Sequence, residues 1–151
     1  MITLQLSHMH GIASDMIAEF THGWPSHVDT VMSDGRLLGA RSDVWSPVPA
    51  GVQLRPDPYA PFSKTDRLVI PCTLAQEGDY YNFLMAQIGK PYDKEAIIGL
   101  AIGRNWRNPD MWFCSELVAA GLETAKIIRP IAHGIEFISP RDIWIIGSAI
   151  V

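Results

Sequence analysis

The sequence predicts an α+β protein in which an antiparallel sheet packs against helices. All but one of the predicted strands precede residue 75, the two strongest helical patterns follow it, and an Asp-Gly turn signal joins two of the strands. The chain has 151 residues, of which 48% are apolar and 19% are charged. This size and composition exclude a disordered chain, so we expect residues 1–151 to form a single domain.

The N-terminal part should contain three strands and one helix. We expect a strand over Thr3–Leu6 and a helix over Ile12–Phe20, whose apolar residues share one face. Two further strands, His27–Met32 and Arg36–Ala40, flank Ser33-Asp34-Gly35. Because Asp-Gly between two such runs is typical of a tight turn, these two strands should form a hairpin.

The middle of the chain begins with a proline-rich connection, Ser46–Lys64. Its five prolines forbid a helix, so we expect a long surface loop with at most a short edge strand. Arg67–Leu74 is a predicted strand that Pro71 places near an edge or a bulge. Ala75–Ile88 has helical spacing, and Gly89 should end that helix.

The C-terminal part contains the clearest helical pattern, Phe113–Ala125, which Asp110 could cap. We expect a short strand over Ile135–Ile138. Ser139 as N-cap and Pro140 at the first helical position then predict a final helical turn or two.

Charge and composition exclude several classes of partner. The net charge is −4, from 12 basic and 16 acidic residues without a Lys/Arg run, so we expect no nucleic-acid partner. No apolar stretch reaches the ~20 residues that span a bilayer, and no signal peptide opens the sequence. We therefore expect a soluble, cytoplasmic protein without an integral membrane segment, and association with a phage particle fits the same pattern.

Cys114 is the first candidate for chemistry, because it lies in the first turn of the predicted helix Phe113–Ala125. The N-terminal end of a helix favours thiolate over thiol, and its free N–H groups can stabilise an oxyanion. The alternative is a packing residue, since Cys114 also lies on the apolar stripe of that helix.

A nucleophilic cysteine needs a base, and His27 is the best placed of the five histidines. It begins a predicted strand, which would present the imidazole at a fixed height to the cysteine helix. His8 and His10 form a His-x-His pair, but two ligands do not make a metal site, so we expect neither a metal nor another cofactor. His133 is expected in a turn.

Three motifs in this order resemble the permuted papain-like enzymes, the circularly permuted branch of the NlpC superfamily. That branch includes the bacterial YiiX-type proteins and is related to lecithin:retinol acyltransferase. The resemblance covers roughly residues 22–122 and implies a circularly permuted papain-like fold. The motifs are Ser26-His27-Val28-Asp29, Gly89-Lys90-Pro91-Tyr92-Asp93 and Trp112-Phe113-Cys114-Ser115-Glu116-Leu117-Val118.

The resemblance implies roles for individual residues: Cys114 as nucleophile, His27 as base and Tyr92 as a substrate-binding residue close to the cysteine. Glu116 should have a structural role, because it points away from the nucleophile on the helix.

One family feature is absent. The family carries a polar residue on the following strand to orient the imidazole, where this sequence has Gly39 or Ala40. Three residues could substitute for it: Asp29, which shares a strand face with His27, and Ser42 or Asp43. If Asp34-Gly35 is a two-residue loop, Ser42 lies opposite His27.

The leading functional hypothesis is a cysteine-dependent hydrolase, an amidase or peptidase that acts through a Cys–His pair and a thioacyl intermediate. Its substrate would be a small amide, peptide or acyl compound. One alternative is an acyltransferase or thioesterase acting on lipid-like acyl groups. Another is a non-catalytic binding or assembly module that keeps the fold, an alternative that the missing polar residue favours.

Overall fold

The structure is a computed structural model that describes residues 1–95, 110–131 and 134–150. Five strands form one antiparallel sheet in the order β4-β3-β2-β1-β5, which confirms the α+β class. No helix among the described residues is long and apolar enough to cross a membrane. The strands are β1 (Ile2–His8), β2 (His27–Val31), β3 (Leu37–Arg41), β4 (Gly51–Arg55) and β5 (Lys64–Ile70).

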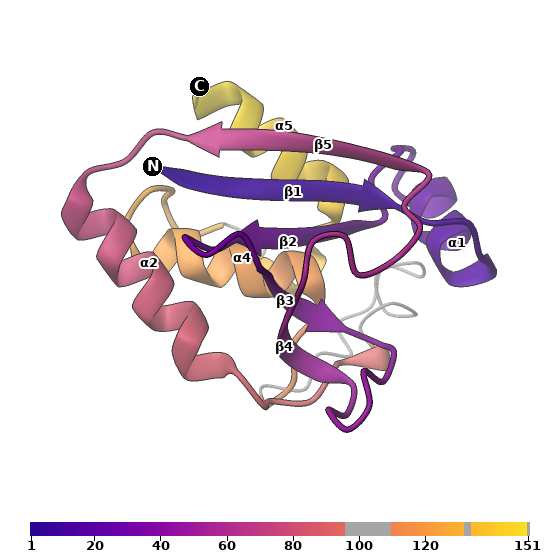
Figure 1. The fold of residues 1–151 in the computed structure, drawn as a ribbon. Coiled ribbons are helices and arrows are strands. Elements are labelled where there is room, and N and C mark those ends of the chain that lie inside the picture. The colour runs from indigo at the N-terminus through magenta and orange to yellow at the C-terminus, as the bar shows by residue number, and fades with distance from the viewer. Residues whose placement is uncertain (96–109, 132–133, 151) are drawn as a thin grey trace.

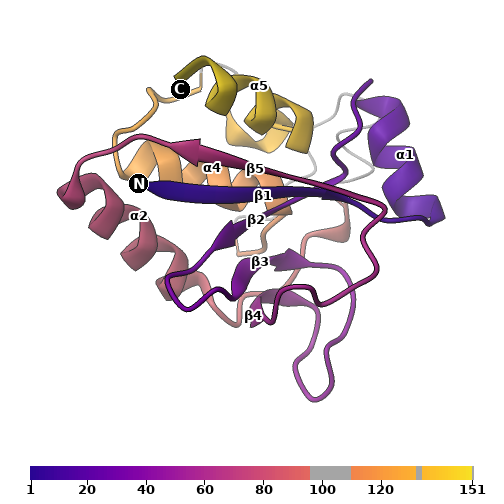
Figure 2. The same cartoon turned by 45° about the horizontal axis from the view of Figure 1, so that its top comes forward.

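Three helices, α2 (Leu74–Gln87), α4 (Cys114–Thr124) and α5 (Pro140–Ile150), lie on one side of the sheet (Figures 1 and 2). The helix α1 (Ile12–Phe20) lies at the end of the sheet where β1 finishes and β2 begins. The predicted bounds of α1 are confirmed. This arrangement leaves the second side of the sheet to the connections between strands.

The two faces of the sheet differ sharply in polarity, because successive side chains of a strand point to opposite faces. The helix-facing side is apolar and fully buried, and its members are Ile2, Leu4, Leu6, Val28, Leu38, Ala40, Val52 and Ile70. The opposite side, which we call the polar face, is also buried but carries Gln5, Ser7, His27, Asp29, Arg41, Gln53 and Arg55. Burial of so many polar groups requires that they be paired with one another.

The helices α2 and α4 contact each other closely at Gly121. A Cβ atom built at Gly121 would lie 2.7 Å from Cε2 of Tyr80. Tyr80 is completely buried, and its hydroxyl is 2.7 Å from the hydroxyl of Thr30 on β2. The tyrosine therefore ties α2 to the sheet, and glycine is the residue that lets α4 pack against it.

The β2–β3 hairpin has a three-residue loop, Ser33 to Gly35, in which Gly35 takes a φ of 83°. The amide of Met32 donates to the carbonyl of Arg36 at 2.8 Å and closes the loop. The hairpin is confirmed, but the extra loop residue shifts the register: Thr30 pairs with Leu38. Continued along both strands, this register places Arg41 opposite His27. The predicted position of Ser42 opposite His27 is therefore wrong.

The proline-rich connection contains β4, an edge strand as expected. The prediction of a strand over Arg67–Leu74 is wrong in its bounds, because β5 runs from Lys64 to Ile70 and ends before Pro71. Thr73 starts α2 instead: its hydroxyl accepts from the amide of Gln76 at 3.2 Å in a capping box.

Two C-terminal expectations are also wrong. Asp110 does not cap α4, because the helix begins at Cys114, where the carboxylate of Glu116 accepts from the amide of Phe113 at 3.1 Å. Ile135–Phe137 is a 3₁₀ turn rather than a strand, since no strand of the sheet pairs with it.

Ser139 caps α5 as expected. Its hydroxyl accepts from the amide of Asp142 at 3.2 Å, and the Asp142 carboxylate accepts in return from the Ser139 amide at 2.9 Å. The helix is 11 residues long, which exceeds the predicted turn or two.

The contact at Gly121 predicts a position-dependent effect of Gly→Ala changes. Gly121→Ala should lower the free energy of unfolding by about 1–3 kcal/mol, because the new methyl group overpacks against Tyr80. Gly78→Ala on α2 is the matched control. It has nothing within 4 Å of the new Cβ and should stabilise by about 0.5–1 kcal/mol. Urea unfolding measures both, and equal effects would contradict the close packing.

Candidate active site

Cys114 is the first residue of α4, and its side chain is completely buried. The backbone amides of Val28 and Ser115 lower the pKa of its thiol, which places the sulfur near the residue that directly follows His27. A short bridge between Tyr92 and Trp112 brings the Gly-Lys-Pro-Tyr segment to the start of the same helix. The three motifs singled out in the sequence therefore meet at one end of β2.

His27 is held by Asp29, two residues further along β2. The Nε2 atom of His27 lies 2.8 Å from Oδ1 of Asp29, and both residues are buried. Because an ionised carboxylate only accepts hydrogen bonds, Nε2 carries the proton in the neutral imidazole. The other ring nitrogen, Nδ1, is then unprotonated and able to accept a proton.

The residue opposite Asp29 is Gly39, one of the two positions at which the sequence lacked the expected polar side chain. A Cβ atom at Gly39 would overlap with Oδ1 of Asp29. The Asp29 carboxylate therefore occupies the space that a side chain on β3 would need. Aspartate on β2 and glycine on β3 form a complementary pair, with the carboxylate supplied from the neighbouring strand.

Burial and pairing set the charges of this cluster. Burial would raise the pKa of Asp29, but His27, Arg41 and the hydroxyl of Tyr59 together lower it below its usual value. Burial lowers the pKa of His27, against the attraction of Asp29. At neutral pH the pair therefore consists of an aspartate anion and a neutral imidazole.

Cys114 does not follow the expectation of a depressed pKa at a helix N-terminus. Burial raises the pKa of its thiol to about 12, although the amides of Val28 and Ser115 act in the opposite direction. The cost of desolvating the thiolate outweighs the stabilisation that the helix N-terminus gives it, because the thiol has no access to water. The thiol is neutral in this conformation, and no hydrogen bond among the described residues joins Cys114 to His27.

A cavity of about 50 Å³ opens beside His27. Met9, the α1 residues Ser14 and Ile17, and His27 and Tyr92 are among the residues that line it. Tyr92 is 6% exposed, and burial raises its pKa, with a smaller contribution from Cys114. The remaining lining residues are Ser26, Arg41 and Ser42.

The other candidates from the sequence lie differently. Ser42 lines the cavity without a hydrogen bond to His27, and Asp43 accepts from Arg55 at 2.8 Å and from Arg41 at 3.2 Å. His8 lies 3.2 Å from Asp15, and among the described residues no third His, Cys, Asp or Glu completes a metal-binding group with them. His133 lies outside the described residues.

Sequence reasoning missed Tyr59, Arg41 and Arg55, which surround Asp29 and Asp43. The alternation of Gln53 and Arg55 along β4 could have indicated a polar face. Tyr59 lies in the proline-rich connection, where no periodicity points to it.

Comparisons with known proteins support the fold alone. No protein-family model matches the chain, and no curated protein matches it. The fold is similar to the crystal structure of the metalloprotein YiiX from Escherichia coli O157:H7, with a TM-score of 0.63 and 20% sequence identity. The similarity covers 85% of this chain and 67% of the YiiX chain.

YiiX is a metalloprotein, and a metal site in this chain would need several donor side chains close together. Among residues 1–95, 110–131 and 134–150, no three His, Cys, Asp or Glu side chains gather closely enough to hold an ion. This donor set does not fit a metal, which needs at least three protein ligands in a typical site.

The depressed pKa of His27 predicts acid sensitivity. Below the pKa of about 6.5 of a free histidine, His27 binds a proton in the unfolded chain but stays neutral in the folded chain. The free energy of unfolding therefore falls as the pH falls. His27 adds a slope of at most ~1.4 kcal/mol per pH unit there. His27→Gln should flatten this slope, and His10→Gln, at an exposed histidine, is the control. Thermal unfolding of the wild type and both variants at several pH values measures how stability changes with pH. An unchanged slope in His27→Gln would contradict the buried neutral imidazole.

Proposed function

We propose that the chain is a cysteine-dependent hydrolase of amide or peptide bonds, built as a single domain with a circularly permuted papain-like fold. Cys114 is the nucleophile, His27 the base and Asp29 the residue that orients the imidazole. The observation that carries the proposal is the hydrogen bond between Nε2 of His27 and Asp29, at the strand end that Cys114 contacts. That bond leaves Nδ1 as the proton acceptor.

The reaction starts from a neutral thiol and a neutral imidazole. His27 Nδ1 accepts the proton of Cys114 as the sulfur attacks the carbonyl carbon of the substrate, and the carbonyl oxygen becomes an oxyanion. The C–N bond then breaks, and the imidazolium gives its proton to the leaving amine. Water, deprotonated by His27, attacks the thioester carbon and displaces the Cys114 sulfur, which recovers its proton from the imidazolium. The acid product is released.

Two further groups fit this reaction. The backbone amide of Ser115, in the first turn of α4, acts on the Cys114 sulfur and can donate to an oxyanion formed beside it. Tyr92 lines the cavity together with His27 and can contact the substrate there.

The fold supports the proposal independently of the site. The sequence motifs resemble a family that includes YiiX-type proteins, and the fold is similar to that of YiiX. Because a fold hosts many activities, the proposal depends on the arrangement of His27, Asp29 and Cys114 rather than on this similarity.

Burial of Cys114 sets a condition on the reaction. The sulfur is fully buried, and Cys114 is not among the residues that line the cavity beside His27. A substrate carbonyl therefore reaches the sulfur only after a local rearrangement that exposes Cys114.

The proposal predicts that alkylation of Cys114 depends on His27. In a Cys72→Ser background, iodoacetamide should label Cys114 at least ~100-fold faster with His27 present than in His27→Ala below about pH 7, the usual range of general-base effects. Intact-mass spectrometry over time measures the rate.

His10→Ala serves as the control for loss of an exposed histidine. Equal, slow labelling in wild type and His27→Ala would make Cys114 a packing residue and would end the hydrolase proposal.

The complementary pair of Asp29 and Gly39 predicts a non-additive double variant. Asp29→Ala and Gly39→Ala should each slow alkylation by about 10–100-fold, the usual effect of an orienting partner. Gly39→Ala acts by displacing the Asp29 carboxylate, so in the Asp29→Ala background it should not slow alkylation any further. Gly78→Ala is the matched control for an added methyl group. Additive losses would show that Gly39 acts by another route.

A second candidate function is favoured by one observation. The Cys114 thiol is fully buried, with its pKa raised to about 12, as in a cysteine that only packs. We therefore keep a non-catalytic binding or assembly module as the alternative to the hydrolase. Transfer of lipid-like acyl groups would use the same residues and differ only in the acceptor of the thioester.

A further inference from the structure

Tyr59 lies in the connection between β4 and β5 and contacts the carboxylate that holds His27. Its hydroxyl is 2.6 Å from Oδ2 of Asp29, and His27 is hydrogen-bonded to the other oxygen, Oδ1. Arg41 Nη1 donates to the hydroxyl of Tyr59, also at 2.6 Å. Each oxygen of the Asp29 carboxylate therefore has its own partner.

The direction of this chain of hydrogen bonds is set by chemistry. Arginine only donates and a carboxylate only accepts, so the Tyr59 hydroxyl must accept from Arg41 and donate to Asp29. A hydroxyl that accepts from a cation is a stronger donor to an anion, because consecutive hydrogen bonds polarise one another. Asp29 is thus held on both sides, by His27 and by Tyr59.

The ring of Tyr59 is held separately from its hydroxyl. The guanidinium carbons of Arg41 and Arg55 lie 4.6 Å and 5.2 Å from the ring centroid, and Phe62 packs edge-on at 5.0 Å. These cation–π and aromatic contacts do not involve the oxygen. Phenylalanine at position 59 should keep the ring in place and remove only the hydrogen bond.

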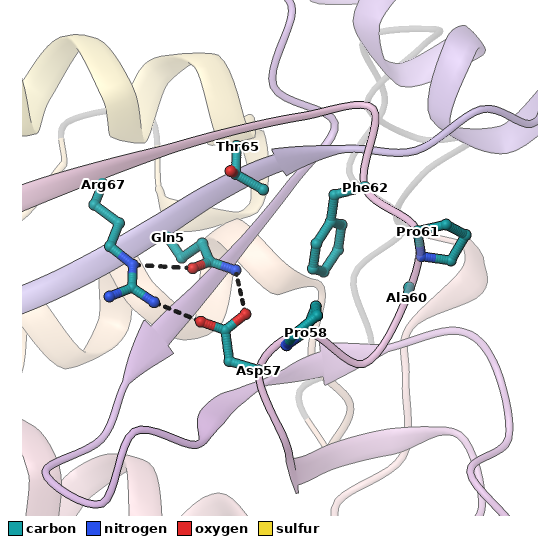
Figure 3. Close-up of a pocket in the computed structure, with 8 residues that line it drawn as sticks. All are labelled: Gln5, Asp57, Pro58, Ala60, Pro61, Phe62, Thr65 and Arg67. Atoms are coloured by element: carbon teal, nitrogen blue, oxygen red, sulfur yellow. Dashed lines mark hydrogen bonds and ion pairs between the residues drawn. The ribbon is translucent and has the colours of Figure 1, made fainter.

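The backbone on either side of Tyr59 is fastened to the sheet. Asp57 is ion-paired with Arg67 on β5 and accepts a hydrogen bond from Gln5 on β1 (Figure 3). Arg67 also donates a hydrogen bond to Gln5. Ser63 donates to the carbonyl of His8 from both its amide and its hydroxyl. The connection therefore presents Tyr59 to Asp29 from a fixed position.

We propose that Tyr59 is a positioning residue of the candidate active site, which fixes the Asp29 carboxylate so that His27 keeps the orientation needed to accept the Cys114 proton. This inference rests on the proposed function and adds to it a fourth residue from the proline-rich connection. The charged and titratable groups that face Asp29 are His27 on β2, Arg41 on β3 and Tyr59 itself, with Asp43 and Arg55 next to them.

The test compares Tyr59→Phe with Tyr81→Phe in the Cys72→Ser chain. Tyr81 is a matched control, because its hydroxyl donates to the carbonyl of Val31 on the same strand β2 at 3.2 Å, away from the site. We expect Tyr59→Phe to slow alkylation of Cys114 by about tenfold near neutral pH, the usual effect of losing a hydrogen bond to a charged group. The difference should shrink as the pH approaches the thiol pKa of about 12, since the thiol then ionises without help from His27.

A structural role alone would give another result. Loosening of the fold exposes Cys114 and speeds labelling, so a faster rate in Tyr59→Phe would overturn the proposal. The proton NMR signal of the His27 Nε2–H group provides a second readout, and it should shift in Tyr59→Phe and not in Tyr81→Phe.

The failure of this inference is distinguishable from failure of the proposed function. If His27→Ala and Asp29→Ala slow alkylation while Tyr59→Phe leaves both the rate and the NMR signal unchanged, Tyr59 has no positioning role and the hydrolase proposal stands. If His27→Ala has no effect on alkylation, the proposed function fails, and the Tyr59 inference fails with it.

Discussion

The buried carboxylate of Asp29 is the interaction on which the rest of the polar face depends. An isolated charge in the interior is very unfavourable, so the chain must surround Asp29 with partners. His27 and Tyr59 hydrogen-bond to its two oxygens, and Arg41 supplies the nearby positive charge. Gly39 leaves the space that the carboxylate fills. One aspartate therefore determines the residues at neighbouring positions on β2, on β3 and in the β4–β5 connection.

The proline-rich connection completes this arrangement. In many sheets a polar face would be open to water, but here Arg55 is 2% exposed and pairs with Asp43, which lies just before the connection. Arg55 also lies over the rings of Trp45 and Tyr59. The connection thus replaces water as the partner of the buried charges, and the electrostatics around His27 depend on residues that are distant from it in sequence.

The state of the candidate site follows from the same burial. A neutral thiol and a neutral imidazole are the charge states that a dry interior favours, and the helix end at Cys114 does not overcome desolvation. Catalysis by this pair would require the ions to form when a substrate reaches the sulfur. Because Cys114 is fully buried, a reaction would also require its side chain to become accessible.

The sequence by itself determined the α+β class, the bounds of α1, the hairpin, the edge position of β4 and the residues worth testing at Cys114, His27 and Asp29. These features depend on local periodicity, turn chemistry and motifs, which a sequence contains directly. The sequence could not determine the loop length of the hairpin, and a single residue there moved Arg41 into the place expected for Ser42. It also suggested a strand at Ile135–Ile138, because an apolar run does not show whether another strand is there to pair with it. Only the tertiary structure showed that Asp29 fills the space above Gly39, that Tyr59 holds Asp29, and that burial leaves Cys114 neutral. These are contacts between segments distant in sequence and effects of the exclusion of water. Local sequence patterns show neither of them.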